Sequence, residues 1–471
     1  MLHLKPGIFT LPTELLYHIV DELTTTELKN LRFACSQLNN TLESLLFSQI
    51  TLDTNHPQMV QDLALNHTRI GNYVRCLHIP SLALETDTER VFTRHLVPAL
   101  SSLKSLTSIN WTVTETDSHW AIEQVITHLS PLPTLFNLNL YLKGLWIQPI
   151  PLPFHRICQF KHLRSCAIQV DDNRLLLLIA EGLFDANKFH IESLKLDGGF
   201  DSFTDPERYM TNDTDLAMLF NSTNDKFCNL GLGCVHPMPM APRLKELSLS
   251  QFPLRHSPSI LSQLGSLKAL HLDRCIPYDF WKMCVEAGIQ LMEITVDHVD
   301  ESFLDYLESY QGLERITVAF NGIQIRGSVH ELNAERFWGT CVPRHSRTIR
   351  EVSVQPKNKG RWCFSNENVE SFRMCGLVEE LAVGIDVDEK DDIILLLQVA
   401  DSYKKLKSLT VLLKGRGLPW DFIRCEQART EFHGAIANHR HWNHSAYEVT
   451  VLTRSEQNRR ASFRRSSVVK C

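Results

Sequence analysis

A short apolar pattern that returns along most of the chain is the feature that most restricts its fold. The pattern is six residues long, apolar-x-x-apolar-x-apolar, and it recurs in twelve copies at related intervals. Successive copies start 32, 29, 28, 28, 53, 23, 24, 22, 36, 29 and 28 residues apart. One copy has little value in a chain that is 43% hydrophobic, but a recurring interval indicates a stack of similar units. The copies are Val74–Ile79, Leu106–Trp111, Leu135–Leu140, Leu163–Ile168, Ile191–Leu196, Leu244–Leu249, Leu267–Leu272, Leu291–Val296, Leu313–Val318, Ile349–Val354, Val378–Val383 and Leu406–Val411.

A second pattern fills five of the intervals between these copies. Apolar residues stand there at i, i+3, i+4 and i+7, the spacing of a helix with one buried face. Strand, helix and strand in this order predict parallel neighbouring strands joined by right-handed crossovers. The five sets are Ile122, Val125, Ile126, Leu129; Leu176, Ile179, Ala180, Leu183; Phe280, Met283, Cys284, Ala287; Phe303, Tyr306, Leu307, Tyr310; and Ile393, Leu396, Leu397, Ala400.

The interval between copies is similar to that of leucine-rich repeats, which hold about 20–29 residues each. We therefore expect an α/β fold in which residues 73–452 form a curved leucine-rich-repeat solenoid, with parallel inner strands and outer helices. A doubly wound sheet has the same alternation of elements, but it rarely holds so many strands. The 53-residue interval predicts an insertion at about residues 198–242, which is rich in turn-forming residues.

Three short helices are predicted in residues 8–50, ahead of the repeats. Thr24 and Glu27 have the spacing of a capping box, which would start the second helix. A module this small cannot bury all of its apolar residues against itself, so some apolar surface is left for a partner or for the rest of the chain. Its apolar positions are Leu15, Leu16, Ile19, Val20, Leu23, Leu28, Leu31, Leu38, Leu42, Leu45 and Leu46.

This segment resembles the F-box. The match consists of Leu11-Pro12-x-Glu14-Leu15, Ile19, Leu23, Glu27-Leu28-x-x-Leu31-x-x-Ala34-Cys35, Leu38 and Leu46-Phe47. It departs at Leu38, where the family often has Trp, and at Glu27, where Asp is frequent. The resemblance implies docking onto the Skp-family adaptor of a cullin-RING ubiquitin ligase. The residues that would form the docking face are Leu11, Pro12, Leu15, Ile19, Leu23, Leu28 and Leu31.

A connecting segment at residues 51–72, with one helix around Met59, Val60 and Leu63, is expected to join the F-box to the first repeat. The whole arrangement is similar to fungal F-box proteins with divergent leucine-rich repeats. It implies the substrate-recognition subunit of an SCF-type E3 ubiquitin ligase, a protein that brings its target close to the ligase and performs no chemistry itself. We expect the outward side chains of the inner strands to bind the target protein, and the candidates are Lys195, Lys245, Ser248, His271, Thr295 and Thr317.

Two other functions remain open at this point. One is a leucine-rich-repeat scaffold outside any ligase, whose N-terminal helices cap the solenoid. The other is an enzyme with its site in the insertion from Gly198 to Pro242, although GxxxxGK[ST], GxGxxG, GxSxG and HExxH are all absent. Cys228, Cys234 and His236 lack the C-x2-C spacing and the fourth ligand of a zinc site. We therefore expect no metal and no cofactor.

Cysteine usage and charge suggest the compartment. Thirteen cysteines without any CxxC pair predict free thiols, and the start of the sequence lacks the pattern of a signal peptide, so we expect a cytoplasmic or nuclear protein. A net charge of −6, thinly spread, argues against a general binder of nucleic acids or membranes. Residues 453–471 are basic and are predicted to be a disordered tail, in which Ser462 and Ser467 follow Arg pairs and are candidate phosphorylation sites.

Overall fold

The chain forms two compact units, unit 1 at Met1–Ile191 and unit 2 at Glu192–Cys471, in the computed structural model. The structure describes residues 15, 19–20, 22–33, 42–65, 69–84, 86–144, 154–171, 173–187, 190–198, 243–251, 254, 264–275, 277, 279–320, 328–389, 391–416, 421–440 and 447–452.

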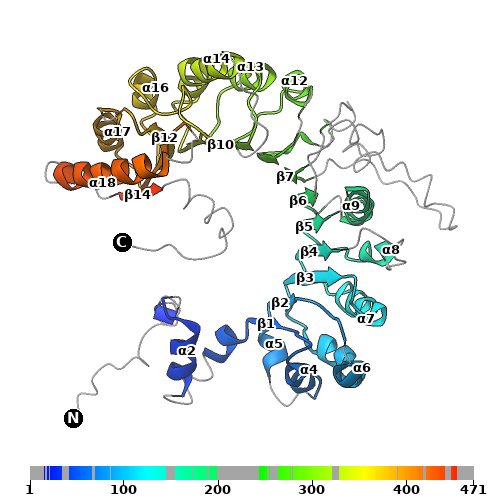
Figure 1. The fold of residues 1–471 in the computed structure, drawn as a ribbon. Coiled ribbons are helices and arrows are strands. Elements are labelled where there is room, and N and C mark those ends of the chain that lie inside the picture. Colours follow the sequence, from blue (N-terminus) through cyan, green and yellow to red (C-terminus); the bar gives the residue numbers. More distant parts are fainter. Residues whose placement is uncertain are drawn as a thin grey trace, which may run out of the picture. The chain divides into compact units, whose positions relative to one another are not determined.

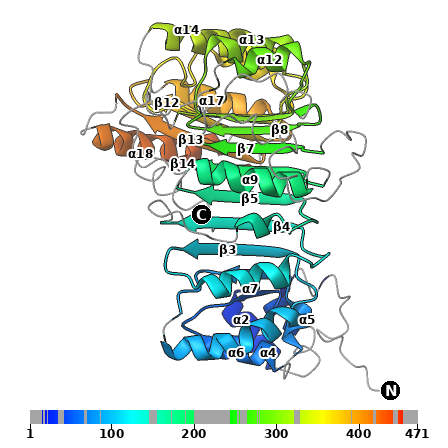
Figure 2. The ribbon, with the colours of Figure 1, turned by 90° about the vertical axis from the view of Figure 1, so that its right-hand side faces the viewer.

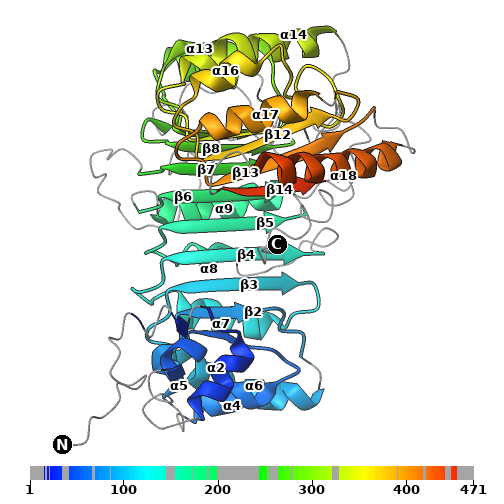
Figure 3. The same cartoon turned by 90° about the vertical axis from the view of Figure 1, so that its left-hand side faces the viewer.

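Unit 1 is a row of parallel strands with helices on one face (Figure 1). Figure 2 shows helices α7 and α9 in front of the strands, and Figure 3 shows the opposite face with the strands in front. The strands are β1 (Gln49–Thr51), β2 (Cys76–Ile79), β3 (Ser108–Thr114), β4 (Asn137–Lys143) and β5 (Ser165–Val170). The helices are α2 (Thr25–Arg32), α4 (Pro57–Ala64), α5 (Ile70–Tyr73), α6 (Thr86–Ser102), α7 (His119–Leu129), α8 (Phe154–Ile157) and α9 (Asn173–Asn187).

Unit 2 repeats this plan with nine parallel strands in chain order. They are β6 (Ser193–Gly198), β7 (Glu246–Ser250), β8 (Ala269–Asp273), β9 (Glu293–Val296), β10 (Arg315–Ala319), β11 (Glu351–Gln355), β12 (Glu380–Asp386), β13 (Ser408–Lys414) and β14 (Glu448–Leu452). The helical segments are α12 (Phe280–Glu286), α13 (Glu301–Ser309), α14 (Ser328–Arg336), the π-helix η4 (Phe337–Cys341), α15 (Val342–Arg344), α16 (Val369–Met374), α17 (Asp391–Ser402) and α18 (Asp421–Arg440).

The core of each unit lies between its strands and its helices. Side chains alternate across a strand, so every second residue faces the helices. In β3 the residues Ile109, Trp111 and Val113 are buried, and the residues between them are half-buried. We call the sheet face that points away from the helices the open face.

Aromatic side chains fill much of the core of unit 2. The Trp281 ring of α12 lies 4.8 Å from the Phe303 ring and 5.1 Å from the Tyr306 ring, both on α13. Tyr306 is followed by Tyr310 at 5.0 Å, and Tyr310 by His345 at 5.1 Å. Large buried rings of this kind give the helices of successive repeats a continuous contact.

Buried polar side chains close the turn ahead of several strands. In unit 1, Asn187 accepts a hydrogen bond from the Leu163 N–H at 3.0 Å and donates to the carbonyls of Phe160 and Leu183. In unit 2, the Tyr306 hydroxyl takes this position and accepts from the Leu291 N–H at 3.1 Å. These bonds satisfy backbone groups that the interior would otherwise leave unpaired.

All twelve copies of the apolar pattern are strands, from β2 to β13, and their parallel pairing within each unit is confirmed. The five predicted helical sets lie on α7, α9, α12, α13 and α17, and the predicted connecting helix is α4. Two strands were missed, β1 and β14. Within each unit the strands follow chain order and the helices cover one face, so the fold is an α/β solenoid and not a doubly wound sheet.

Several predictions fall outside the described residues. They concern the insertion beyond Gly198, up to residue 242, and the basic segment 453–471 with Ser462 and Ser467. Cys228, Cys234 and His236 lie in that insertion. Among the helices that the structure describes, none combines the length and the apolarity that crossing a bilayer requires.

Candidate functional site

The N-terminal module begins with the predicted capping box. The Thr24 N–H donates to Glu27 Oε2 at 2.7 Å, and the Glu27 N–H donates to Thr24 Oγ1 at 3.3 Å. Both interactions satisfy donors at the start of α2. The hydrogen bonds from the Thr24 side chain and backbone hold the pKa of the Glu27 carboxyl below its usual value.

A small apolar cluster holds this module together. Val20 and Leu42 are buried at its centre, and Leu42 belongs to a short helical stretch at residues 42–46. Half-buried residues that pack against this pair are Leu28, Leu31, Leu45 and Leu46. Two of the predicted docking residues, Leu28 and Leu31, therefore contact the interior of the module.

Two other predicted docking residues remain at the surface. The exposed fraction is 49% for Leu15 and 40% for Ile19, and Leu23 is half-buried. Leu11 and Pro12 lie outside the described residues. Leu15 and Ile19 are four residues apart in sequence, and exposed apolar side chains that form one patch are a common sign of a protein contact surface. The structure thus separates the predicted set into residues that hold the module together and residues open to a partner.

Five of the six predicted target-binding residues lie together on the open face of unit 2. They form one row, because β6 to β10 pair in a register that places them side by side. The sixth, Lys245, stands before β7 and pairs with Glu192, with 2.7 Å between Lys Nζ and Glu Oε2. The row consists of Lys195, Ser248, His271, Thr295 and Thr317.

His271 lies at the centre of a polar group on this face. Its Nδ1 is 2.9 Å from Thr295 Oγ1, and its Nε2 is 3.8 Å from Glu246 and 3.7 Å from Glu293. These groups come from β7, β8 and β9, three adjacent strands. The protonated imidazole would be attracted to both carboxylates.

A second row, at the N-terminal ends of the strands of unit 2, does not follow from the sequence predictions. It includes Glu246, Glu293, Glu351, Glu380 and Glu448, and we call these five residues the acidic row. The register of the paired strands aligns them across β7 to β14. Aligning the twelve copies would have revealed the first four of these glutamates, because each is the third residue of its copy, just before the second apolar position.

The C-terminal ends of β6, β8 and β9 bring three aspartates to the same part of the sheet. Asp273 accepts from Ser250 Oγ at 3.3 Å, and Asp297 accepts from the Arg274 backbone N–H at 2.8 Å. Burial raises the pKa of Asp297 to about 6, and it also raises the pKa of Asp197. Loss of water around a carboxylate favours its neutral form.

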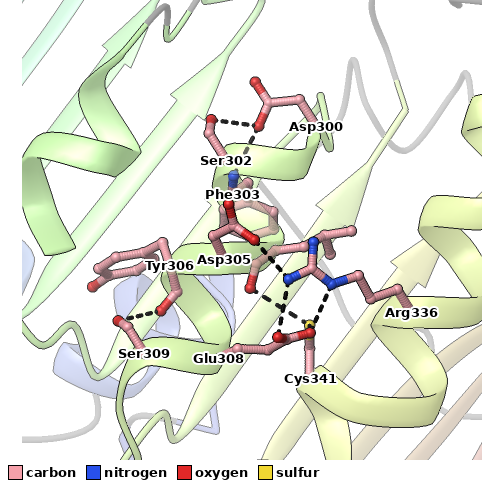
Figure 4. Close-up of polar contacts among 10 residues, drawn as sticks. Asp300, Ser302, Phe303, Asp305, Tyr306, Glu308, Ser309, Arg336 and Cys341 are labelled. Atoms are coloured by element: carbon pink, nitrogen blue, oxygen red, sulfur yellow. Dashed lines mark hydrogen bonds and ion pairs between the residues drawn. The ribbon is translucent and has the colours of Figure 1, made fainter.

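On the helix side of unit 2, a polar group joins α13 to α14 (Figure 4). Arg336 Nε lies 2.8 Å from Glu308 Oε1, and Arg336 Nη2 lies 2.6 Å from Asp305 Oδ1. The hydrogen bond from Arg336 lowers the pKa of Glu308, whereas burial raises the pKa of the nearby Cys341 thiol. Because Arg336 balances these carboxylates within the fold, the group ties two helices together and offers little to a ligand.

No group of His, Cys, Asp and Glu in the described part of the chain has the arrangement of a metal site. Burial raises the pKa of several thiols, and for Cys166 and Cys284 it reaches about 12. Such thiols stay protonated at neutral pH and are poor nucleophiles. The candidate functional sites among the described residues are therefore two surfaces. One is the exposed apolar surface of the N-terminal module, and the other is the charged open face of unit 2.

Comparison with known proteins finds no matching family model and no matching curated protein. Two solved structures share features of the chain. The Rad7–Elc1 complex of yeast is 13% identical, with 87% of this chain and 89% of that chain covered and a TM-score of 0.37. The TLR13–ssRNA13 complex is 13% identical, with 74% of this chain and 48% of that chain covered and a TM-score of 0.29. At these values neither similarity carries a conclusion about function.

Proposed function

We propose that this chain is the substrate-recognition subunit of an SCF-type cullin-RING E3 ubiquitin ligase. In this proposal the N-terminal module is an F-box that docks on the Skp-family adaptor, and the repeats hold a target protein. The chain performs no chemistry, because its contribution is to bring the target close to a ubiquitin-conjugating enzyme. It would act in the cytoplasm or the nucleus, where such ligases work.

The observation that carries the proposal is the way in which the N-terminal module uses its apolar residues. Val20 and Leu42 form a core within the module, so the module has an interior of its own. Leu15 and Ile19 are left exposed, at positions that the F-box resemblance assigns to the adaptor contact. A helical cap would instead bury such side chains on the repeat next to it.

An alternative proposal is a repeat scaffold whose N-terminal helices cap the solenoid. Its support is the direct connection between the module and the sheet. The Ser48 carbonyl, just after the helical residues 42–46, accepts from the N–H groups of Arg75 and Cys76. Under this alternative the unmodified chain does not capture an adaptor.

The test is capture of a purified Skp-family adaptor by the full chain and by the double variant Leu15→Glu/Ile19→Glu. Two charges in an apolar contact leave unpaired carboxylates at the interface, so we expect at least a hundredfold loss of adaptor affinity. The matched control is Leu332→Glu/Ile394→Glu, which changes the same residue types at exposed positions of α14 and α17. The control is expected to bind as the unmodified chain does.

Both other outcomes contradict the proposal. If the double variant still captures the adaptor, Leu15 and Ile19 are not the docking residues. If the unmodified chain fails to capture any adaptor, the capping alternative replaces the ligase proposal. A urea unfolding curve of each variant separates a lost contact from a lost fold.

A further inference from the structure

The open face of unit 2 is strongly acidic. Alternate residues of its nine strands place eight carboxylates on this face, against three basic side chains, Lys195, Arg315 and Lys414. The carboxylates are the acidic row together with Asp197, Asp273 and Asp386. Asp297 adds a further carboxylate just after β9.

Only part of this charge is neutralised within the fold. Arg315 lies between two members of the acidic row, with Nη1 3.1 Å from Glu293 and Nε 3.9 Å from Glu351. Glu380 and Glu448 are exposed, and neither forms an ion pair with another described residue. Ion pairs this exposed contribute only about 0–1 kcal/mol each, so the acidic row can exchange them for contacts with a partner.

The row of residues that precedes the strands is charged as well, but it is balanced. Arg350 lies 4.0 Å from Glu314 and 3.6 Å from Glu379, and Lys407 lies 2.5 Å from Glu379. Lys245 likewise pairs with Glu192. These pairs leave the acidic row as the main unbalanced charge near this edge of the sheet.

We propose that the open face of unit 2 binds an extended, Lys- and Arg-rich segment of the target protein, laid across the strands along the acidic row. This inference rests on the proposed function, because it names the kind of target that the receptor holds. The acidic row runs from β7 to β14, which corresponds to about 34 Å at the usual distance between strands. An extended segment of about ten residues covers that length.

Charge also decides against the other common class of extended partner. A nucleic acid presents a dense row of phosphates and binds to surfaces rich in Lys and Arg. The same row of carboxylates that attracts a basic peptide repels such a polyanion. The rate at which a basic segment associates is expected to rise at low salt, because the surface potential guides it.

The experiment measures the binding of a fluorescent peptide to the full chain by anisotropy. The probe alternates Arg and Ser over about twelve residues, and a peptide with Glu in place of Arg is its control. In the variant Glu293→Gln/Glu351→Gln/Glu380→Gln we expect at least a tenfold weaker affinity for the basic probe. Raising NaCl from about 50 to about 300 mM should weaken binding to the unmodified chain as well.

The matched control variant is Glu286→Gln/Glu367→Gln/Glu389→Gln. It removes three exposed carboxylates that do not lie on the strands, and it is expected to bind the probe as the unmodified chain does. Equal binding by both triple variants, or equal binding of the acidic peptide, overturns the proposal. A further outcome also overturns the proposal: the unmodified chain does not bind the basic probe, but a variant with Arg459, Arg460, Arg464 and Arg465 changed to Gln does. In that case the chain's own basic segment, and not a target, occupies the face of the unmodified chain.

Adaptor capture is measured with the same proteins. Glu293→Gln/Glu351→Gln/Glu380→Gln is expected to capture the adaptor fully while it loses the basic peptide. If the unmodified chain captures the adaptor but does not bind the basic peptide, only the proposed class of target is overturned. Failure of adaptor capture by the unmodified chain, with intact peptide binding, overturns the ligase proposal and leaves the acidic face as a peptide-binding surface.

Discussion

The open faces of unit 1 and unit 2 differ in charge although the two units share one architecture. In unit 1 the open-face strand residues include no carboxylate, and Lys143 is the one Lys or Arg among them. Amide side chains contact one another instead, as in the 2.6 Å hydrogen bond from Asn139 to Asn110. In unit 2 the corresponding positions hold eight carboxylates.

This difference shows which residues determine the fold and which are free to serve binding. The buried residue of each alternating pair packs against the helices, and its apolar character is kept in both units. The residue between two buried positions contacts solvent, so its charge can change at little cost to stability. Unit 1 and unit 2 therefore have the same core pattern and different surfaces.

The two units also close their turns with different buried groups. Asn187 makes three hydrogen bonds to backbone groups in unit 1, and Tyr306 and His345 accept from the Leu291 and Leu313 N–H groups in unit 2. A short amide and a large ring thus satisfy the same kind of backbone donor. The ring in addition joins the aromatic core of unit 2.

The largest expected effect on stability comes from removing the Asn187 hydrogen bonds in unit 1. Asn187→Leu leaves one buried N–H and two buried carbonyls without the partner they had, and we expect a loss of about 3 kcal/mol or more in the free energy of unfolding. Urea unfolding measures the loss. Hydrogen exchange should rise in peptides that cover β4 to α9.

The matched change in unit 2 is Tyr306→Phe. It removes one hydroxyl, which donates to the Ile289 carbonyl and accepts from the Leu291 N–H, and it keeps the aromatic packing. We expect a smaller loss of about 1–2 kcal/mol, with faster exchange confined to peptides around β9. If Tyr306→Phe lowered the free energy of unfolding as much as Asn187→Leu does, the smaller contribution expected from the Tyr306 hydroxyl would be contradicted.

A smaller effect on stability is expected from Asp297, a buried carboxyl group of unit 2. The pKa of Asp297 is raised to about 6 by burial, with a contribution from the charge of Asp273. The native state therefore holds its proton more tightly than the unfolded state, whose carboxyl has a pKa of about 3.9, and stability falls as pH rises from about 4 to 6. Asp297→Asn removes this fall and can still accept from the Arg274 N–H.

The raised pKa of Asp297 corresponds to a cost of up to about 3 kcal/mol at pH 7.5. Part of this cost is offset by the stronger hydrogen bond that a carboxylate, compared with an amide, accepts from the Arg274 N–H. We therefore expect Asp297→Asn to be more stable than the unmodified chain by about 1 kcal/mol at pH 7.5, and the difference should shrink toward zero near pH 4. Urea unfolding of both proteins across this pH range is the measurement. Asp53→Asn in unit 1 is the comparison, because hydrogen bonds hold the pKa of that carboxyl below its usual value, mainly the one from the Asn55 N–H. A constant Asp297→Asn effect from pH 4 to 7.5 would contradict the role of burial.

The strands and helices were predictable because their apolar residues recur at fixed spacing. Phe47-x-x-Ile50-x-Leu52 and Ala446-x-x-Val449-x-Val451 also fit the six-residue pattern, yet β1 and β14 were missed. The first overlaps the end of the segment that resembles the F-box, and the second follows a stretch rich in His. Both lie at an end of the repeat array, where the interval to a neighbouring copy gives less support.

The candidate sites were only partly predictable from the sequence. The positions of Lys195, Ser248, His271, Thr295 and Thr317 in one row follow directly from the repeat, because equivalent residues of parallel strands stand side by side. The acidic row needed the register of the strands as well. Which apolar residues of the N-terminal module are exposed depends on how its helices pack, and a spacing of Leu residues does not determine that.

The most direct test of the central claim, that the chain binds through two separate surfaces, is affinity purification followed by mass spectrometry. Three full-length proteins are compared: the unmodified chain, Leu15→Glu/Ile19→Glu, and Glu293→Gln/Glu351→Gln/Glu380→Gln. We expect the first variant to lose a Skp-family adaptor and a cullin and to keep its targets, whereas the second keeps the adaptor and loses proteins with Lys- and Arg-rich segments. Absence of adaptor and cullin from all three samples, or their retention by Leu15→Glu/Ile19→Glu, would contradict the account.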